Sequence, residues 1–180
     1  MITLITGGMR SGKSAYAEKI LAGYNDVVYI ATAAVTDDEM KTRVKKHIER
    51  RNPNWRTYEA FRNLKSAVGS ERFYLLDCVT NLISRILFDI TGMKENITAD
   101  DTQNVITDSF NELNMLITEI KKIDGTLIIV TNEVGSSIIP MNPIARCFAD
   151  AQGIVNTKLA TLTDEVFLTV CGIPIKIKGF

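Results

Sequence analysis

A glycine-rich segment near the amino terminus has the residue types and the spacing of a phosphate-binding loop. Residues 7–14 read GGMRSGKS, which matches the pattern G-x-x-x-x-G-K-[S/T]. Its glycines let successive N–H groups turn toward an anion, and the amino terminus of a following helix adds positive charge there. In this pattern Lys13 reaches the β- and γ-phosphates, Ser14 binds Mg²⁺ through its hydroxyl, and Arg10 offers a second cation. The sequence therefore predicts a nucleoside triphosphate site rather than a plain tight bend.

Two carboxylates follow apolar runs typical of core strands. Asp77 ends the run RFYLLD, as a Walker B acid does, and a carboxylate in that position can hold the shell of a bound Mg²⁺. The alternative is that Asp77 caps the helix expected from residue 79. Glu133 follows the run LIIVTN, and it either activates a hydroxyl or bonds within its own loop. The residues alone leave that second choice open.

The chain has one histidine, His47, on a helix expected over residues 38–51. Imidazole is largely neutral near pH 7, so His47 has the chemistry of a nucleophile or a base. Lysines and arginines surround it, however, and a lone histidine on a charged helix is more often a surface or packing residue. Judged by pattern alone, His47 is therefore structural, and Trp55 is a core residue.

The elements that must position these residues alternate along the chain. Strands are expected at residues 2–6, 27–31, 73–77, 126–131, 165–170 and 174–178. Helices are expected at residues 14–22, 38–51, 63–68, 79–88, 100–122 and 144–162, with a surface connection at 89–101. Such alternation favours an α/β fold with a mostly parallel sheet covered on both faces. The last two strands are too close for a helical crossover, which predicts an antiparallel hairpin at the sheet edge.

Composition narrows the class of protein. The 180 residues carry a formal net charge of zero, without a basic block, so a nucleic-acid partner is not expected. The three cysteines lack metal-ligand spacing, and no apolar run approaches the ~20 residues that a membrane helix needs. The first strand begins where a signal peptide would lie. We expect one domain over residues 1–180, without a transmembrane segment, in the cytoplasm.

Several longer motifs together resemble the adenosylcobinamide kinase/adenosylcobinamide-phosphate guanylyltransferase family. They are GGMRSGKS, YIATA from residue 29, DDEMKTRVKKHIERRNPNWRTYE from residue 37, LLDCVTNLISRILF from residue 75 and VTNEVGSSIIP from residue 130. The tail from residue 142 is also similar, so the resemblance spans essentially the whole chain. It implies a RecA-like P-loop NTPase fold with a C-terminal antiparallel edge hairpin, and a homo-oligomer, with a trimer suspected.

The resemblance also implies two reactions and their residues. The enzyme phosphorylates adenosylcobinamide with ATP or GTP, and then transfers GMP from GTP to adenosylcobinamide phosphate through a guanylyl-histidine, which is placed on His47. Lys13 is the second catalytic residue, and Ser14 and Asp77 serve Mg²⁺. The nucleotide contacts implied are Gly7, Gly8, Met9, Arg10, Ser11, Gly12, Lys13, Ser14, Ala31, Thr32, Ala33, Ile48, Glu49, Arg50, Arg51, Glu59 and Asp77.

Two other functions compete with this interpretation. One is a P-loop kinase with a single activity on another small molecule, in which His47 is structural. The other is a non-catalytic nucleotide switch, but such proteins usually carry a guanine-reading N-K-x-D motif, and the sequence has none. The presence of Lys13, Ser14, Asp77 and His47 together favours an enzyme.

Overall fold

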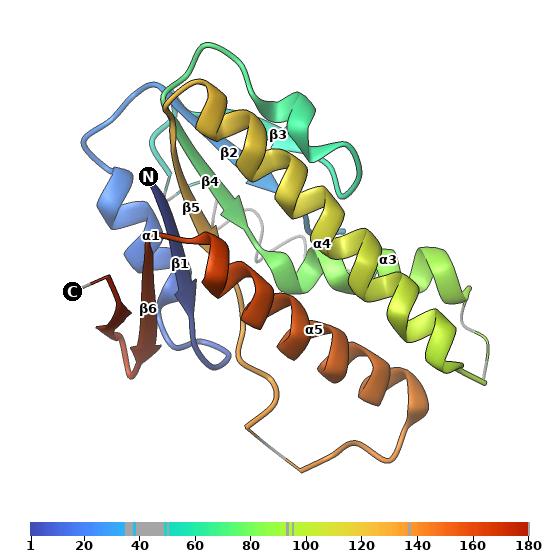
Figure 1. Ribbon diagram of the computed structural model, residues 1–180. Coiled ribbons are helices and arrows are strands. Elements are labelled where there is room, and N and C mark those ends of the chain that lie inside the picture. Colours follow the sequence, from blue (N-terminus) through green and yellow to red (C-terminus); the bar gives the residue numbers. More distant parts are fainter. Residues whose placement is uncertain are drawn as a thin grey trace.

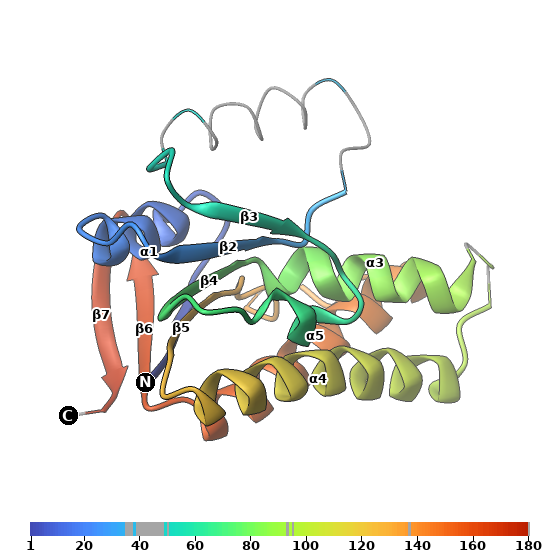
Figure 2. The same ribbon diagram turned by 90° about the horizontal axis from the view of Figure 1, so that it is seen from above.

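A seven-stranded sheet in the order β3-β2-β4-β5-β1-β6-β7 forms the centre of the computed structural model (Figures 1 and 2). The structure describes residues 1–34, 38, 49, 51–92, 94, 96–136 and 138–179. The strands are β1 (Ile2–Thr6), β2 (Val27–Ala31), β3 (Arg56–Glu59), β4 (Phe73–Asp77), β5 (Thr126–Val130), β6 (Glu165–Val170) and β7 (Ile173–Lys178). The helices are α1 (Lys13–Leu21), α3 (Val79–Thr91), α4 (Ala99–Lys122) and α5 (Pro143–Leu162), with a 3₁₀ turn, η1 (Leu64–Ala67).

Helices cover both faces of the sheet, as expected for parallel strands that are apolar on each side. Helix α1 packs on one face, where Ala17 and Leu21 meet Ile5, Tyr29 and Leu75. Helices α3, α4 and α5 cover the other face and form the larger core (Figures 1 and 2). No helix among the described residues is long and apolar enough to cross a membrane.

Most of the predicted elements are confirmed. Four strands have the expected bounds; β5 ends one residue earlier than predicted, and β7 starts one residue earlier. The antiparallel pairing of β6 with β7 is confirmed, and the other strand pairs are parallel. The predicted surface connection at 89–101 is shorter than expected, because α3 runs to Thr91 and α4 starts at Ala99. Most of the predicted helix over 38–51 lies outside the described residues.

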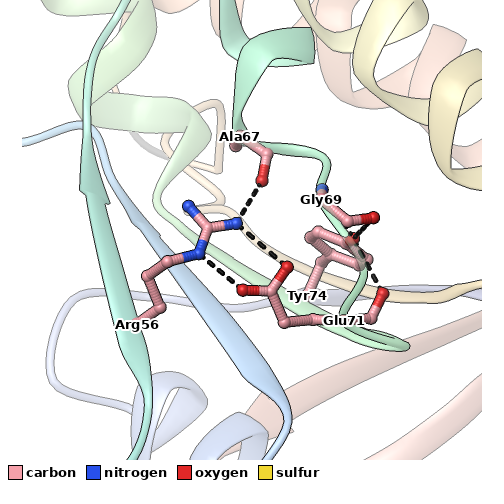
Figure 3. Close-up of polar contacts among 5 residues, drawn as sticks. All are labelled: Arg56, Ala67, Gly69, Glu71 and Tyr74. Carbon is pink, nitrogen blue, oxygen red and sulfur yellow. Dashed lines mark hydrogen bonds and ion pairs between the residues drawn. The ribbon is translucent and has the colours of Figure 1, made fainter.

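Strand β3 was not predicted, because its sequence RTYE is polar and its residues are mostly exposed. It is an edge strand, paired with β2 on one side only. Figure 3 shows how its first residue is fixed: Arg56 Nε lies 2.5 Å from Glu71 Oε1, and Arg56 Nη2 donates to Ala67 O at 2.7 Å. Tyr74 OH then donates to Glu71 O at 2.8 Å. A side-chain network therefore replaces the apolar pattern that normally marks a strand.

The register of the parallel strands brings four carboxyl ends to one edge of the sheet. Ala31 pairs with Asp77, Asp77 with Val130, and Val130 with Ile5, just before the glycine-rich loop. The strand that carries Asp77 is not the direct neighbour of the loop strand, because β5 lies between β1 and β4. One strand inserted between the loop strand and the acid-bearing strand gives the RecA-like order. The fold is therefore the expected RecA-like P-loop NTPase.

Candidate functional site

A cavity of about 710 Å³ opens at this carboxyl edge of the sheet. Such edges are where open α/β folds bind ligands. Three groups of residues line it: the loop and the start of α1, the ends of β2, β4 and β5, and the segments that follow those strands. The lining residues are Met9, Arg10, Ser11, Gly12, Lys13, Ser14, Ala15, Tyr29, Ala31, Ala33, Arg51, Asp77, Cys78, Thr80, Asn81, Val130, Asn132, Glu133 and Val134.

The phosphate-binding loop packs against the end of β6 and the turn between β6 and β7. Gly172 N–H donates to Ser11 O at 2.9 Å, and a Cβ on Gly7 would lie only 2.4 Å from Thr169 O. Gly7 and Gly12 have φ values of 148° and 99°, which L side chains rarely adopt. Glycine is therefore required at Gly7 for two reasons, a positive φ and a close approach of two backbones.

Lys13 is buried under the loop that precedes it. Its Nζ donates to Gly8 O at 2.6 Å, so the ammonium points back toward the loop. Backbone N–H groups, the amino terminus of α1 and this cation converge on the same part of the cavity. The arrangement fits the β- and γ-phosphates of a nucleotide.

Asp77 also lines the cavity, and its carboxylate is hydrogen-bonded to a buried tyrosine. Tyr29 OH donates to Asp77 Oδ2 at 2.9 Å, and Arg51 lies with its Cζ 3.7 Å from the centre of the Tyr29 ring. Burial, followed by the charge of Asp77, raises the pKa of Tyr29 far above its usual value. The phenol therefore stays protonated and acts as the donor, and the Asp77 carboxylate accepts.

Thr32 fixes the segment after β2 to the segment after β4. Its Oγ1 donates to Cys78 O at 2.7 Å and accepts from Cys78 N–H at 2.9 Å. Arg85 on α3 lies 3.5 Å from Thr32 O and stacks over Phe61. Burial and the nearby Asp77 charge raise the pKa of Cys78 to about 11, so this thiol is not a nucleophile at neutral pH.

A polar network supports the third wall of the cavity, after β5. Asn132 N–H and Nδ2 donate to Thr80 Oγ1 at 3.1 and 3.0 Å, and Asn156 Nδ2 donates to Asn132 O at 3.0 Å. Glu133 N–H donates to Gly7 O at 3.0 Å, which joins this wall to the loop. The Glu133 carboxylate accepts from Gly135 N–H at 2.8 Å and stays exposed at the cavity rim.

Comparison with known proteins places this cavity in a family. The family model described as "Cobinamide kinase / cobinamide phosphate guanyltransferase" matches residues 3–177. The chain belongs to this family. It is therefore an enzyme, in agreement with the resemblance seen in the sequence motifs.

Full-length relatives of this cobinamide kinase / cobinamide phosphate guanyltransferase family are similar throughout. "Bifunctional adenosylcobalamin biosynthesis protein CobU" of Salmonella typhimurium is 39% identical over 184 residues, which cover 99% of this chain and 100% of the relative. The protein of the same name from Escherichia coli is 38% identical, with coverage of 99% and 100%. "Bifunctional adenosylcobalamin biosynthesis protein CobP" of Pseudomonas aeruginosa is 34% identical, with coverage of 99% and 98%. The KaiC-like protein PH0186 of Pyrococcus horikoshii superposes with a TM-score of 0.49 at 12% sequence identity. The superposition covers 93% of this chain and 69% of that chain, and this structural similarity is too low to support a conclusion about function.

The structure brings together most, but not all, of the nucleotide contacts expected for this family. Those that line the cavity are Met9, Arg10, Ser11, Gly12, Lys13, Ser14, Ala31, Ala33, Arg51 and Asp77. Gly7, Gly8 and Thr32 do not line the cavity: Gly7 and Thr32 are buried, and Gly8 is exposed. Glu49 and Glu59 are exposed and do not line the cavity. His47, Ile48 and Arg50 lie outside the described residues.

The donor set of the cavity fits a magnesium ion held jointly with a nucleotide. The Ser14 hydroxyl and the Asp77 carboxylate both line it, and both are the hard oxygen donors that Mg²⁺ prefers. Among the described residues there is no cluster of three or more His, Cys, Asp or Glu that could hold a metal ion alone. Mg²⁺ commonly uses one or two protein oxygens together with substrate phosphates, so this sparse set suits it.

Tyr29 is one of the cavity residues that the sequence did not identify, as are Cys78, Thr80 and Asn81. It lies inside the YIATA motif on a buried strand, where an aromatic residue normally signals core packing. The hydroxyl of Tyr29 could have indicated a polar role, because a buried tyrosine OH needs a hydrogen-bond partner. That partner, Asp77, is set by the pairing of β2 with β4, which is a long-range feature.

Proposed function

We propose that the protein is a bifunctional enzyme of cobalamin biosynthesis that phosphorylates adenosylcobinamide and then guanylylates the product. ATP or GTP supplies the phosphoryl group, and GTP supplies GMP, so the final product is adenosylcobinamide-GDP. One observation carries the proposal: Lys13, Ser14 and Asp77 line one cavity in a chain that matches the family over residues 3–177. The relatives, named as bifunctional adenosylcobalamin biosynthesis proteins, support both activities.

In the kinase step, an alcohol oxygen of adenosylcobinamide attacks the γ-phosphorus of the nucleotide. A new O–P bond forms, the bond from the γ-phosphorus to the bridging oxygen breaks, and the nucleoside diphosphate leaves. Lys13 and the loop N–H groups stabilise the charge on the phosphate oxygens. A bound Mg²⁺ would neutralise part of that charge and would be held by Ser14 and Asp77.

The base that takes the alcohol proton is one of two carboxylates in the described lining, Asp77 and Glu133. Asp77 accepts a hydrogen bond from Tyr29 and is assigned to the magnesium shell. Glu133 lines the cavity and is exposed, so it is accessible to a large second substrate. We assign the base to Glu133 for this reason.

In the guanylyl step, an imidazole nitrogen of His47 attacks the α-phosphorus of GTP. An N–P bond forms, the bond from the α-phosphorus to the bridging oxygen breaks, and pyrophosphate leaves. A phosphate oxygen of adenosylcobinamide phosphate then attacks the same phosphorus and releases the imidazole. Arg51 follows His47 by four residues and lines the cavity, which supports a place for His47 near the nucleotide. Covalent catalysis of this kind divides one difficult transfer into two easier steps.

Intact-mass spectrometry tests the guanylyl half. Purified protein is mixed with GTP and Mg²⁺, beside His47→Ala and the neighbouring control Lys46→Ala. We expect the mass of one GMP to be added to the wild type and to Lys46→Ala, in a bond stable to base and labile to acid, and nothing to be added to His47→Ala. If no adduct forms while GTP binds, the guanylyl half is wrong. The chain is then a kinase with a structural histidine.

A further inference from the structure

Tyr29 contacts two charged residues that line the nucleotide cavity. Its hydroxyl donates to Asp77 Oδ2 at 2.9 Å, while Arg51 stacks on its ring at 3.7 Å. All three side chains line the same cavity, yet Tyr29 itself is only 5% exposed. Packing in the protein core therefore fixes the position of the Tyr29 side chain.

The strand register explains how the hydroxyl reaches the carboxylate. Tyr29 pairs with Leu75 and Ala31 pairs with Asp77, so Tyr29 and Asp77 are diagonal neighbours on one face of the sheet. The Tyr29 ring packs beside Leu75 on the face covered by α1. The bond is made to Oδ2, one of the two carboxylate oxygens of Asp77, and it restricts the orientation of that carboxylate.

The ring has a separate role through Arg51. A guanidinium stacked on an aromatic face is held by both its charge and its planar shape. Arg51 stands at the end of the segment that carries His47, four residues earlier. The ring therefore anchors one end of that segment at the cavity wall.

We propose that Tyr29 is a positioning residue for both half-reactions, which it serves through different atoms. Its hydroxyl orients Asp77 for phosphoryl transfer, and its ring seats Arg51 for guanylyl transfer. The assignment rests on the proposed function, because it needs both activities in one cavity. It goes beyond that function by giving one buried side chain two separable roles.

Two substitutions at this position separate the roles. Tyr29→Phe keeps the ring and removes the hydroxyl, so we expect kinase kcat to fall about 10- to 100-fold and the Mg²⁺ concentration for half-maximal rate to rise. The rate of GMP-adduct formation should stay within about twofold of wild type, because the ring still seats Arg51. Tyr29→Leu removes both groups, and both rates should fall by about 10-fold or more.

Tyr24→Phe is the matched control, because Tyr24 stacks on Phe73 and does not line the cavity. It should leave both rates unchanged. Thermal unfolding and GTP titration of each variant show whether a lost rate reflects a lost fold. An equal loss of both rates in folded Tyr29→Phe, or no loss of either, would overturn the inference. A failure of the proposed function would give a different result, because the wild type itself would then form no GMP adduct. In that case the proposed role of the Tyr29 ring in guanylyl transfer would also be wrong.

Discussion

Gly7→Ala introduces one methyl group where two segments of backbone nearly touch. The new Cβ would lie 2.4 Å from Thr169 O on β6 and 2.9 Å from Ser11 Oγ. The φ value of 148° adds conformational strain for any L side chain. Because the nearest obstacle is the backbone of β6, which is paired with strands on both sides, the loop must move away from β6 to make room.

The expected loss of stability combines two terms. A side chain in a sparsely populated backbone region costs about 1–3 kcal/mol. Overpacking by a methyl group costs about 1–3 kcal/mol more, so we expect Gly7→Ala to lower the free energy of unfolding by about 3 kcal/mol. For a chain of this size that corresponds to a fall in Tm of about 6–12 °C. Urea denaturation and a thermal scan, both without nucleotide, measure the two quantities.

Gly8→Ala is the matched control one residue along the chain. A Cβ on Gly8 meets nothing within 4 Å, and its backbone needs no positive φ. This variant should unfold within about 0.5 kcal/mol of wild type. Equal stability of the two variants would refute the argument, since it would show that the loop does not rest on β6 as the geometry requires.

Two further predictions concern titrating groups. The Arg56 hydrogen bond holds the pKa of Glu71 below its usual value, so the stability it gives is present above about pH 4.3 and is lost as the pH falls through the folded pKa. Glu71→Gln should therefore lose about 0.5–1 kcal/mol at pH 7 and should converge with wild type in urea titrations near pH 3. Iodoacetamide at pH 8 should alkylate exposed Cys171 in the folded protein and spare Cys78, whose burial raises its pKa to about 11. Peptide mapping that finds Cys78 modified as fast as Cys171 would contradict this.

Structural features that depend only on local sequence could be predicted. The strands of the central sheet are continuous apolar runs, and the loop pattern identifies itself by its glycines, Lys13 and Ser14. Strand β3 was not predictable in this way, because its polar residues form a strand only through pairing with β2 and the bonds of Arg56. Edge strands often carry charged residues, which is how they avoid pairing with other chains.

The order of strands is the second feature that local sequence does not contain. The sequence of a strand does not show which strands are its neighbours in the sheet. The position of β5 between β1 and β4 was therefore visible only in the structure. The same is true of the bond between Tyr29 and Asp77, which depends on the register of β2 against β4. Two residues of one site, 48 positions apart, were both visible in the sequence, but their contact was not.

Hydrogen bonds between the cavity walls hold the site residues in position. The Thr32 hydroxyl exchanges two hydrogen bonds with the backbone of Cys78, and Glu133 N–H donates to Gly7 O, so hydrogen bonds that involve the main chain tie the cavity walls to one another. Beneath them, strands β1, β2, β4 and β5 are almost completely buried. Phosphoryl transfer depends mainly on positioning and charge, which a rigid frame supplies before substrate binds. Substitutions in the strand interiors should therefore act on stability, while substitutions at the strand ends should act on rate with little change in folding.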